Sequence, residues 1–314
     1  MTDRPASPQR VRLRRSLLAV PGSSPRMMQK AAASAADEVF LDLEDAVAPS
    51  EKAAARGKVV EAIKDLDWGS KIVSVRINDL STAWAYRDLI EVVEGAGDRL
   101  DTVIVPKVTR VEDVVFVDTL LTQLERALGL PHRIGVEVLI ETASGMANVE
   151  AIARASDRLE SLIFGPGDYA ASVGVPTLSI GGHAAHYPGH FWHYPLSRVV
   201  VAAKAAGLDA LDGPYDAYRD EEGLREGARL ARALGCDGKM AIHPDQIEPL
   251  NQVFSPTPEE IAWAQRIADR YRAATEEEGL GAVTLDGRLI DAVSLKLADR
   301  VLEKARRIGQ QPSA

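Results

Sequence analysis

Eight short runs rich in β-branched residues constrain the fold of this chain more than any other feature of its sequence. They predict strands over residues 16–21, 38–45, 71–78, 102–108, 133–142, 161–170, 208–215 and 238–244. Most runs begin about 22 to 33 residues apart, with helical periodicity between them, which is the spacing of consecutive strand–helix units. Eight such units predict an α/β fold, a (β/α)8 TIM barrel, over residues 12–244. We expect residues 245–314 to form a C-terminal helical extension.

An open, doubly wound sheet is the alternative fold for alternating strands and helices. Sheets of that kind that bind dinucleotides carry a GxGxxG fingerprint after the first strand. The corresponding stretch here reads AVPGSSPR and holds a single glycine. The closed barrel is therefore the preferred prediction.

Polar residues lie toward the carboxyl ends of the predicted strands from the second to the eighth. They are Glu44 and Asp45, Arg76 and Asn78, Lys107, Glu141, Asp168, Asp212, and His243. In a (β/α)8 barrel the carboxyl ends of all strands meet at one face, where the active sites of such enzymes lie. We therefore expect the active site at this face.

Two of these carboxylates, Glu141 and Asp168, follow neighbouring strands and predict a site for a hard divalent cation. Mg²⁺, with Mn²⁺ as the other candidate, prefers carboxylate oxygens and leaves room for water and an oxygen-rich ligand. The glycines of FGPGD would let the backbone come close to Asp168. The alternative is a structural ion pair of these acids with Arg76 or Lys107.

Arg76 predicts recognition of a carboxylate or of a developing oxyanion, because a guanidinium group donates two parallel hydrogen bonds. Its alternative role is to neutralise the surplus of acid at this face. Together with the metal site, Arg76 favours carbon–carbon chemistry on a small 2-oxo acid. The metal would chelate the acid and stabilise an enolate.

Composition and spacing argue against several other functions. The net charge of −9, without a basic stripe, disfavours nucleic-acid binding, and no run approaches the roughly 18 apolar residues of a membrane span. Cys236 is the single cysteine, so no intramolecular disulfide can form and a cytoplasmic location is expected. Cys236 also precedes its predicted strand, whereas a catalytic nucleophile at this face would lie at the end of a strand. This position argues against a role for Cys236 as a nucleophile. The histidine-rich loop over residues 183–193 does not match a zinc pattern.

The chain resembles the citrate lyase β-subunit-like (HpcH/HpaI) aldolase superfamily in the motifs SVRIN, VIVPKV, VEVLIETASGMANVEAIA, FGPGDYAAS and AIHPDQI, over about residues 12 to 307. GHFWHYPLSRVV, LDGPYDAYRDEEG and GRLIDAVSLK look most like malyl-CoA and β-methylmalyl-CoA lyases. This resemblance implies a reversible, Mg²⁺-dependent Claisen-type carbon–carbon lyase. Its substrate would be (S)-malyl-CoA, β-methylmalyl-CoA or citramalyl-CoA, and its products glyoxylate or pyruvate plus acetyl-CoA or propionyl-CoA.

The resemblance also implies roles for individual residues. Glu141 and Asp168 match the Mg²⁺ ligands, and Arg76 matches the arginine that contacts the oxo acid and the thioester oxygen. The remaining substrate-binding residues are Lys30 and Arg26 for the CoA phosphates, the Gly167 amide for the glyoxylate carboxylate, and Ile242 and His243 for the CoA channel.

Asp291 in GRLID matches the aspartate that the C-terminal segment of a neighbouring subunit delivers to the site. The resemblance therefore implies a homotrimer or homohexamer, with Asp291 removing a proton from acetyl-CoA. Glu44 and Asp45 are then left to hold metal-bound water or to orient Arg76.

Three other functions fit the same residues. A thioesterase would hydrolyse malyl-CoA to free malate on this site. A citrate lyase β subunit would act on an acyl-carrier-protein thioester within a complex. A non-catalytic regulator would bind CoA without turnover.

Overall fold

The computed structural model describes residues 12–182, 190–277 and 279–309 of the 314-residue chain. It divides into two compact units, Met1–Asn251 and Gln252–Ala314. The sequence places the boundary earlier, after residue 244. Asn251 accounts for the difference, because its side chain accepts a hydrogen bond from Ser16 Oγ at 2.7 Å and donates one to the Ala35 carbonyl at 2.8 Å. The segment that follows the last strand is thus tied to the barrel.

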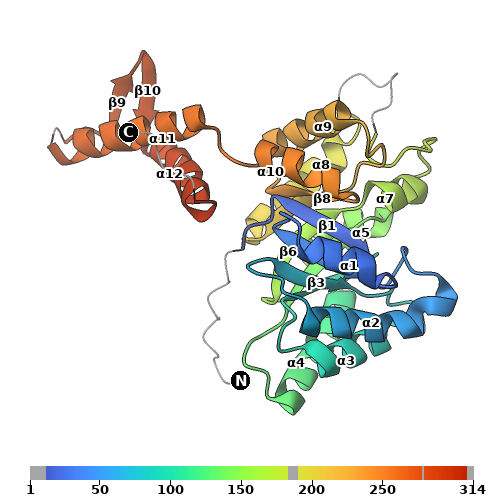
Figure 1. The fold of residues 1–314 in the computed structure, drawn as a ribbon. Coiled ribbons are helices and arrows are strands. Elements are labelled where there is room, and N and C mark those ends of the chain that lie inside the picture. The colour runs from blue at the N-terminus through green and yellow to red at the C-terminus, as the bar shows by residue number, and fades with distance from the viewer. Residues whose placement is uncertain (1–11, 183–189, 278, 310–314) are drawn as a thin grey trace. The chain divides into compact units, whose positions relative to one another are not determined.

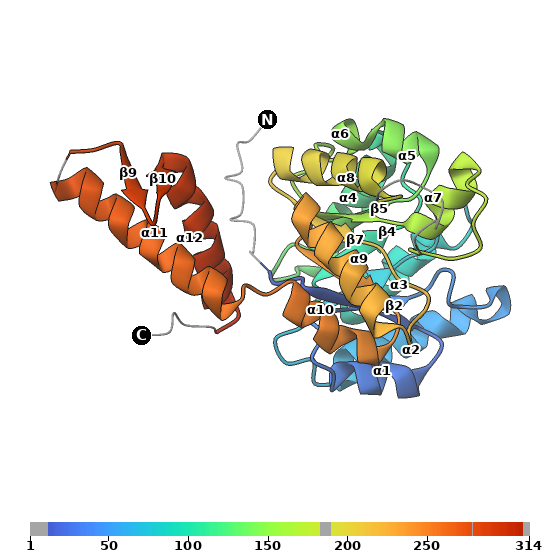
Figure 2. The ribbon, with the colours of Figure 1, turned by 90° about the horizontal axis from the view of Figure 1, so that it is seen from above.

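The first unit is a closed barrel of eight parallel strands in sequential order, which confirms the predicted fold (Figures 1 and 2). The strands are β1 (Ser16–Pro21), β2 (Glu38–Asp42), β3 (Ile72–Arg76), β4 (Thr102–Val105), β5 (Gly135–Ile140), β6 (Leu159–Phe164), β7 (Asp209–Asp212) and β8 (Gly238–Ala241). Pairing of β1 with β8 closes the barrel.

Helices follow the strands and surround the barrel (Figure 2). They are α1 (Pro25–Ala32), α2 (Lys52–Asp65), α3 (Ala85–Ala96), α4 (Val111–Leu128), α5 (Ala143–Ala147), α6 (Val149–Ile152), α7 (Pro166–Val173), α8 (His193–Ala205), α9 (Glu221–Leu234) and α10 (Ile247–Val253), with 3₁₀ turns η1 (Pro49–Glu51) and η2 (Pro244–Gln246). No helix in the described ranges is long and apolar enough to cross a bilayer.

Seven of the eight predicted strands end two to six residues earlier than the sequence pattern indicates, and two of them show why. The run 161–170 is a strand only to Phe164, because Pro166 begins helix α7 and its fixed φ suits the first helical position. The run 38–45 is a strand only to Asp42, whose carboxylate accepts hydrogen bonds from the backbone N–H groups of Glu44 and Ala46 at 2.9 Å and so turns the chain.

The barrel interior has an apolar middle and a charged base. Its apolar cluster comprises Leu17, Phe40, Ile104, Leu139, Ile163, Leu211 and Met240. At the amino ends of the strands lies the buried Arg14, whose guanidinium donates hydrogen bonds to Glu38 at 2.9 Å, Asp209 at 3.0 Å, Glu137 at 3.3 Å and Glu160 at 2.5 Å. One cation therefore links carboxylates from four strands.

Replacing Arg14 by methionine is expected to lower the free energy of unfolding by about 3–5 kcal/mol, because buried carboxylates would lose their shared counter-ion. Urea denaturation measures the loss. Arg133→Met is the matched control: Arg133 pairs with the exposed Asp157 at 2.9 Å, and such surface pairs contribute under about 1 kcal/mol. Equal losses in the two variants would contradict the role assigned to Arg14.

The second unit contains the predicted helix, hairpin and helix. These are α11 (Pro258–Glu277), β9 (Ala282–Leu285), β10 (Arg288–Asp291) and α12 (Ala292–Arg307). Asp286 and Gly287 join the two strands, both with positive φ, as a two-residue hairpin turn requires. Small residues, among them Ala264, Ala268 and Ala298, let α11 and α12 pack closely.

Candidate active site

An arginine–carboxylate pair lies at the ends of strands β2 and β3. Asp42 and Arg76 occupy paired positions on these strands, and Arg76 Nε and Nη2 each donate to Asp42 at 2.7 Å. Burial acts to raise the pKa of Asp42, but the Arg76 guanidinium and two backbone N–H groups hold that pKa below its usual range. Glu44 Oε2 lies 3.1 Å from Arg76 Nη1. Arg76 is therefore held in place by two acids.

Lys107, two residues after β4, connects the acidic side chains of this face. Its Nζ lies 2.7 Å from Glu44, 3.5 Å from Asp45 and 3.9 Å from Asp168. Its backbone N–H donates to Glu141 Oε1 at 2.8 Å. The φ of Lys107 is 51°, a left-handed conformation that costs a non-glycine residue roughly 1 kcal/mol or more. This strained backbone directs the amide to one carboxylate and the side chain to three others.

Glu141 follows β5 directly and is 3% exposed. Burial raises its pKa to about 8; Arg76 opposes the shift, and the charges of Glu44 and Asp168 add to it. A Cβ at Gly165 would lie 2.5 Å from Glu141 Oε2, so only glycine lets the backbone pass this close to the carboxylate. The site thus concentrates negative charge around a buried carboxylate.

Asp168 lies in the first turn of α7 instead of at a strand end. Its side chain is partly exposed, and Gly167 precedes it in the same turn. Backbone N–H groups of a first helical turn have no acceptor within the helix, and the helix dipole favours anions there. Gly167 and Asp168 therefore combine amide donors with a carboxylate.

The donor set fits Mg²⁺. Within the described ranges, no cluster of three or more histidine, cysteine, aspartate or glutamate residues is arranged to hold a metal. Mg²⁺ does not need one, because it commonly binds through one or two carboxylates and completes its shell with water and substrate oxygens. Glu44 Oε2 is buried and accepts no hydrogen bond despite its proximity to Arg76, so it can accept one from a bound water. The histidines at 183 and 186 lie outside the described residues.

Removing the charge of Glu44 is expected to weaken Mg²⁺ binding about 10-fold, because side chains behind the metal ligands typically contribute 10–100-fold in affinity. Glu44→Gln would be compared with the exposed neighbour Asp45→Asn by isothermal titration with Mg²⁺. Complete loss of binding in Glu44→Gln would instead make Glu44 a metal ligand.

The residues predicted to bind CoA lie in two places on the barrel unit. Arg26 and Lys30 are exposed, four residues apart on α1, and so share one helical face. Ile242 and His243 follow β8 and are about 40% exposed. The His243 ring stacks on Tyr218 at 4.8 Å between centroids.

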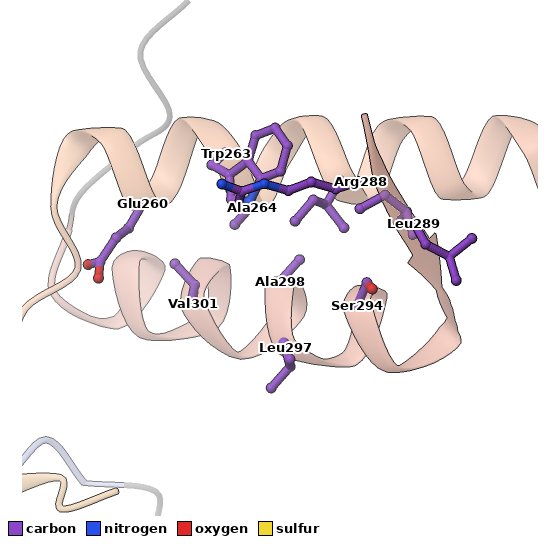
Figure 3. Close-up of a pocket in the computed structure, with 11 residues that line it drawn as sticks. Glu260, Trp263, Ala264, Arg288, Leu289, Ser294, Leu297, Ala298 and Val301 are labelled. Carbon is purple, nitrogen blue, oxygen red and sulfur yellow. The ribbon is translucent and has the colours of Figure 1, made fainter. Parts of the chain in front are cut away.

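Asp291 belongs to the second unit, where it caps α12. Its Oδ1 accepts a hydrogen bond from the Ser294 N–H at 3.0 Å, and this contact is the main reason that its pKa is lowered. Ser294 also lines a pocket of about 340 Å³ between α11, β10 and α12 (Figure 3). Beside it, Leu289 and Leu297 are more than half exposed. An uncovered apolar surface therefore adjoins the predicted base.

Asp42 was not predicted as a site residue, and Lys107 was predicted only as a polar residue of this face and as an alternative ion-pair partner of the acids. Asp42 could have been found from register, because it pairs with Arg76 when strands 38–42 and 72–76 are aligned. The sequence prediction gave Glu44 and Asp45 the role of holding metal-bound water or of orienting Arg76. Glu44 Oε2 lies 3.1 Å from Arg76 Nη1, whereas Asp45 contacts Lys107 instead of Arg76. The left-handed backbone of Lys107 has no signal in the sequence.

Known proteins resemble this chain over nearly its full length. The HpcH/HpaI aldolase/citrate lyase model matches residues 15–244. An L-malyl-CoA/β-methylmalyl-CoA lyase of Cereibacter sphaeroides is 44% identical over 98% of this chain and 99% of its own. A (3S)-malyl-CoA thioesterase of the same species is 36% identical over 94% of this chain and 95% of its own.

A solved structure has the same fold. CitE of Mycobacterium tuberculosis in complex with magnesium, acetoacetate and coenzyme A is 32% identical, with a TM-score of 0.76 over 95% of this chain and 99% of that one. The sequence matches cover the barrel and extend into the second unit. This chain belongs to the HpcH/HpaI aldolase/citrate lyase family.

Proposed function

We propose that this protein is an Mg²⁺-dependent carbon–carbon lyase that reversibly cleaves malyl-CoA to glyoxylate and acetyl-CoA. One observation carries the proposal: contacts connect Arg76, the buried Glu141 and Asp168 at the carboxyl ends of the strands. Glu44 contacts both Arg76 and Lys107, and Lys107 in turn contacts Glu141 and Asp168. This arrangement suits a substrate with one anionic, chelating end and one carbonyl oxygen that gains charge during reaction.

Glu141 and Asp168 would hold the metal. When bound, Mg²⁺ would polarise the carbonyl of the 2-oxo acid. The amide of Gly167 would orient the acid's carboxylate, and Arg76 would donate to the thioester oxygen as it becomes negative. Because Asp42 and Glu44 fix Arg76 before substrate arrives, little reorganisation is needed.

Asp291 would move the proton. In cleavage the hydroxyl proton passes to solvent water, the bond between the hydroxyl-bearing carbon and its neighbour breaks, and glyoxylate forms. Asp291 enters this step carrying a proton taken from solvent. The electron pair of that bond becomes the enolate of acetyl-CoA, which Asp291 protonates. In condensation, Asp291 removes the same proton from the methyl group.

We further propose that Asp291 serves the site of a neighbouring copy, in a homotrimer or homohexamer in the cytoplasm. The apolar surface beside Asp291, with Leu289, Val293 and Leu297 uncovered, supports docking against another copy. Size-exclusion chromatography with light scattering would give the mass, and a monomer at assay concentration would contradict this part of the proposal.

A thioesterase is the rival function, and one relative favours it. The same experiment can also distinguish malyl-CoA from β-methylmalyl-CoA and citramalyl-CoA as the substrate. Purified enzyme would be screened with glyoxylate and pyruvate against acetyl-CoA and propionyl-CoA. Formation of a hydroxyacyl-CoA product with glyoxylate supports the lyase. Absence of both condensation with every pair and hydrolysis of malyl-CoA, while CoA still binds, would favour a CoA-binding regulatory protein. Activity only with carrier-protein thioesters would favour a citrate lyase β subunit.

A further inference from the structure

The segment that follows α7 is anchored to the loop after β7 at Asp216. The backbone N–H of Ile180 donates to Asp216 Oδ2 at 2.8 Å, and the N–H of Asp216 donates to the Ile180 carbonyl at 3.1 Å. Ser179 Oγ adds a third hydrogen bond to Asp216 Oδ1, at 3.1 Å. Three bonds to one residue fix the backbone at Ile180.

The next residue makes this anchorage tighter. Gly181 has a φ of +74°, and a Cβ there would lie 2.1 Å from the Pro214 carbonyl oxygen, so no other residue fits without moving the chain. The indole N–H of Trp192 donates to the Gly182 carbonyl at 3.2 Å. Hydrogen bonds therefore hold the backbone on both sides of Ile180, at Ser179 and at Gly182.

The side chain of Ile180 lies against the first turn of α7. Three of its carbons would be 3.5 Å from a Cβ placed on Gly167. That separation is ordinary van der Waals contact, so the gap between Gly167 and Ile180 is about one methyl group deep. Ile180 is nevertheless 43% exposed, so protein atoms cover only part of it. An apolar side chain is thus held rigidly beside the turn that carries Gly167 and Asp168.

We propose that Ile180 is a specificity-determining residue that forms one wall of the 2-oxo acid subsite and restricts the substituent on the reacting carbonyl. The inference rests on the proposed function, in which Gly167 and Asp168 hold the oxo acid. Glyoxylate carries hydrogen on that carbon and fits; the methyl group of pyruvate crowds Ile180. Shortening the side chain to alanine removes three carbons and opens room for the methyl group.

The test compares condensation of acetyl-CoA with glyoxylate and with pyruvate in wild type, Ile180→Ala and Ile180→Val. One methylene in an apolar pocket discriminates substrates about 10–200-fold. We therefore expect kcat/KM for pyruvate relative to glyoxylate to rise at least about 10-fold in Ile180→Ala, with a smaller rise in Ile180→Val. Leu178→Ala, in the same segment and fully exposed, is the matched control and leaves the ratio unchanged.

Two results would overturn the role of Ile180. One is an unchanged ratio in Ile180→Ala with wild-type turnover of glyoxylate; the other is an equal loss with both acids, which would make Ile180 a structural support. Ile180→Val keeps the comparison valid if the alanine variant unfolds. Failure of the proposed function is distinguishable, because wild-type enzyme would then condense neither acid.

Discussion

Asp291→Asn is expected to lower kcat by about 10³-fold or more, because asparagine cannot accept the proton that the reaction transfers. Folding should be unaffected. Asparagine caps helices as well as aspartate does, and its amide oxygen can accept the Ser294 N–H bond that Asp291 accepts. Steady-state kinetics, with Mg²⁺ and CoA binding measured by titration calorimetry, separates lost chemistry from lost binding.

Asp286→Asn is the matched control for that variant. Asp286 lies in the turn of the same hairpin with a φ of 48°, a conformation that asparagine tolerates, and its partner is Arg266 at the surface. We expect its turnover to remain near that of wild type. Wild-type activity in Asp291→Asn would remove Asp291 from the mechanism.

Mixing inactive variants tests whether Asp291 acts on a neighbouring copy. If Asp291→Asn and Arg76→Met chains assemble together, some sites combine an intact Arg76 with an intact Asp291 from the other chain. Random assembly of equal amounts would restore up to about a quarter of wild-type activity. No recovery from verified mixed oligomers would place both residues of a site in one chain.

Arg76→Met is expected to have the second large effect, on both catalysis and stability. Losing the guanidinium that faces the developing oxyanion should lower kcat by about 10²–10³-fold. It also leaves the buried Asp42 without its bidentate partner, which should cost about 3–5 kcal/mol of unfolding free energy. Kinetics and urea denaturation on the same preparation measure the two effects.

Arg76→Lys is the informative companion, because it keeps the positive charge and loses the forked geometry. We expect it to recover most of the stability and little of the activity. Equal recovery of both would show that charge alone matters and would contradict oriented donation by Arg76.

The barrel and its polar face were predictable because they depend on repeated local patterns. Eight apolar runs with regular spacing predict eight parallel strands, and polar residues after them must then gather at one face. The positions of Glu141 and Arg76 at this face follow from that reasoning alone. In the structure Arg76 lies beside Glu44, Glu141 accepts a hydrogen bond from the Lys107 backbone, and Lys107 Nζ links to Glu44.

The finer geometry was not predictable, because it depends on individual hydrogen bonds, some within a loop and some between distant segments. The bend after Asp42 arises from side-chain acceptance of two backbone N–H groups, and Asp168 belongs to a helix that begins at Pro166. The left-handed Lys107 is stabilised by partners from two other loops, Glu44 and Glu141. No repeating pattern in the sequence signals any of these three features.

The most direct test of the proposed function is product analysis after incubating purified enzyme with (S)-malyl-CoA, with Mg²⁺ and with a chelator in its place. The proposed mechanism predicts glyoxylate and acetyl-CoA in equal amounts when Mg²⁺ is present, and neither with the chelator. Free malate with free CoA, and no glyoxylate, would contradict the lyase and establish hydrolysis instead.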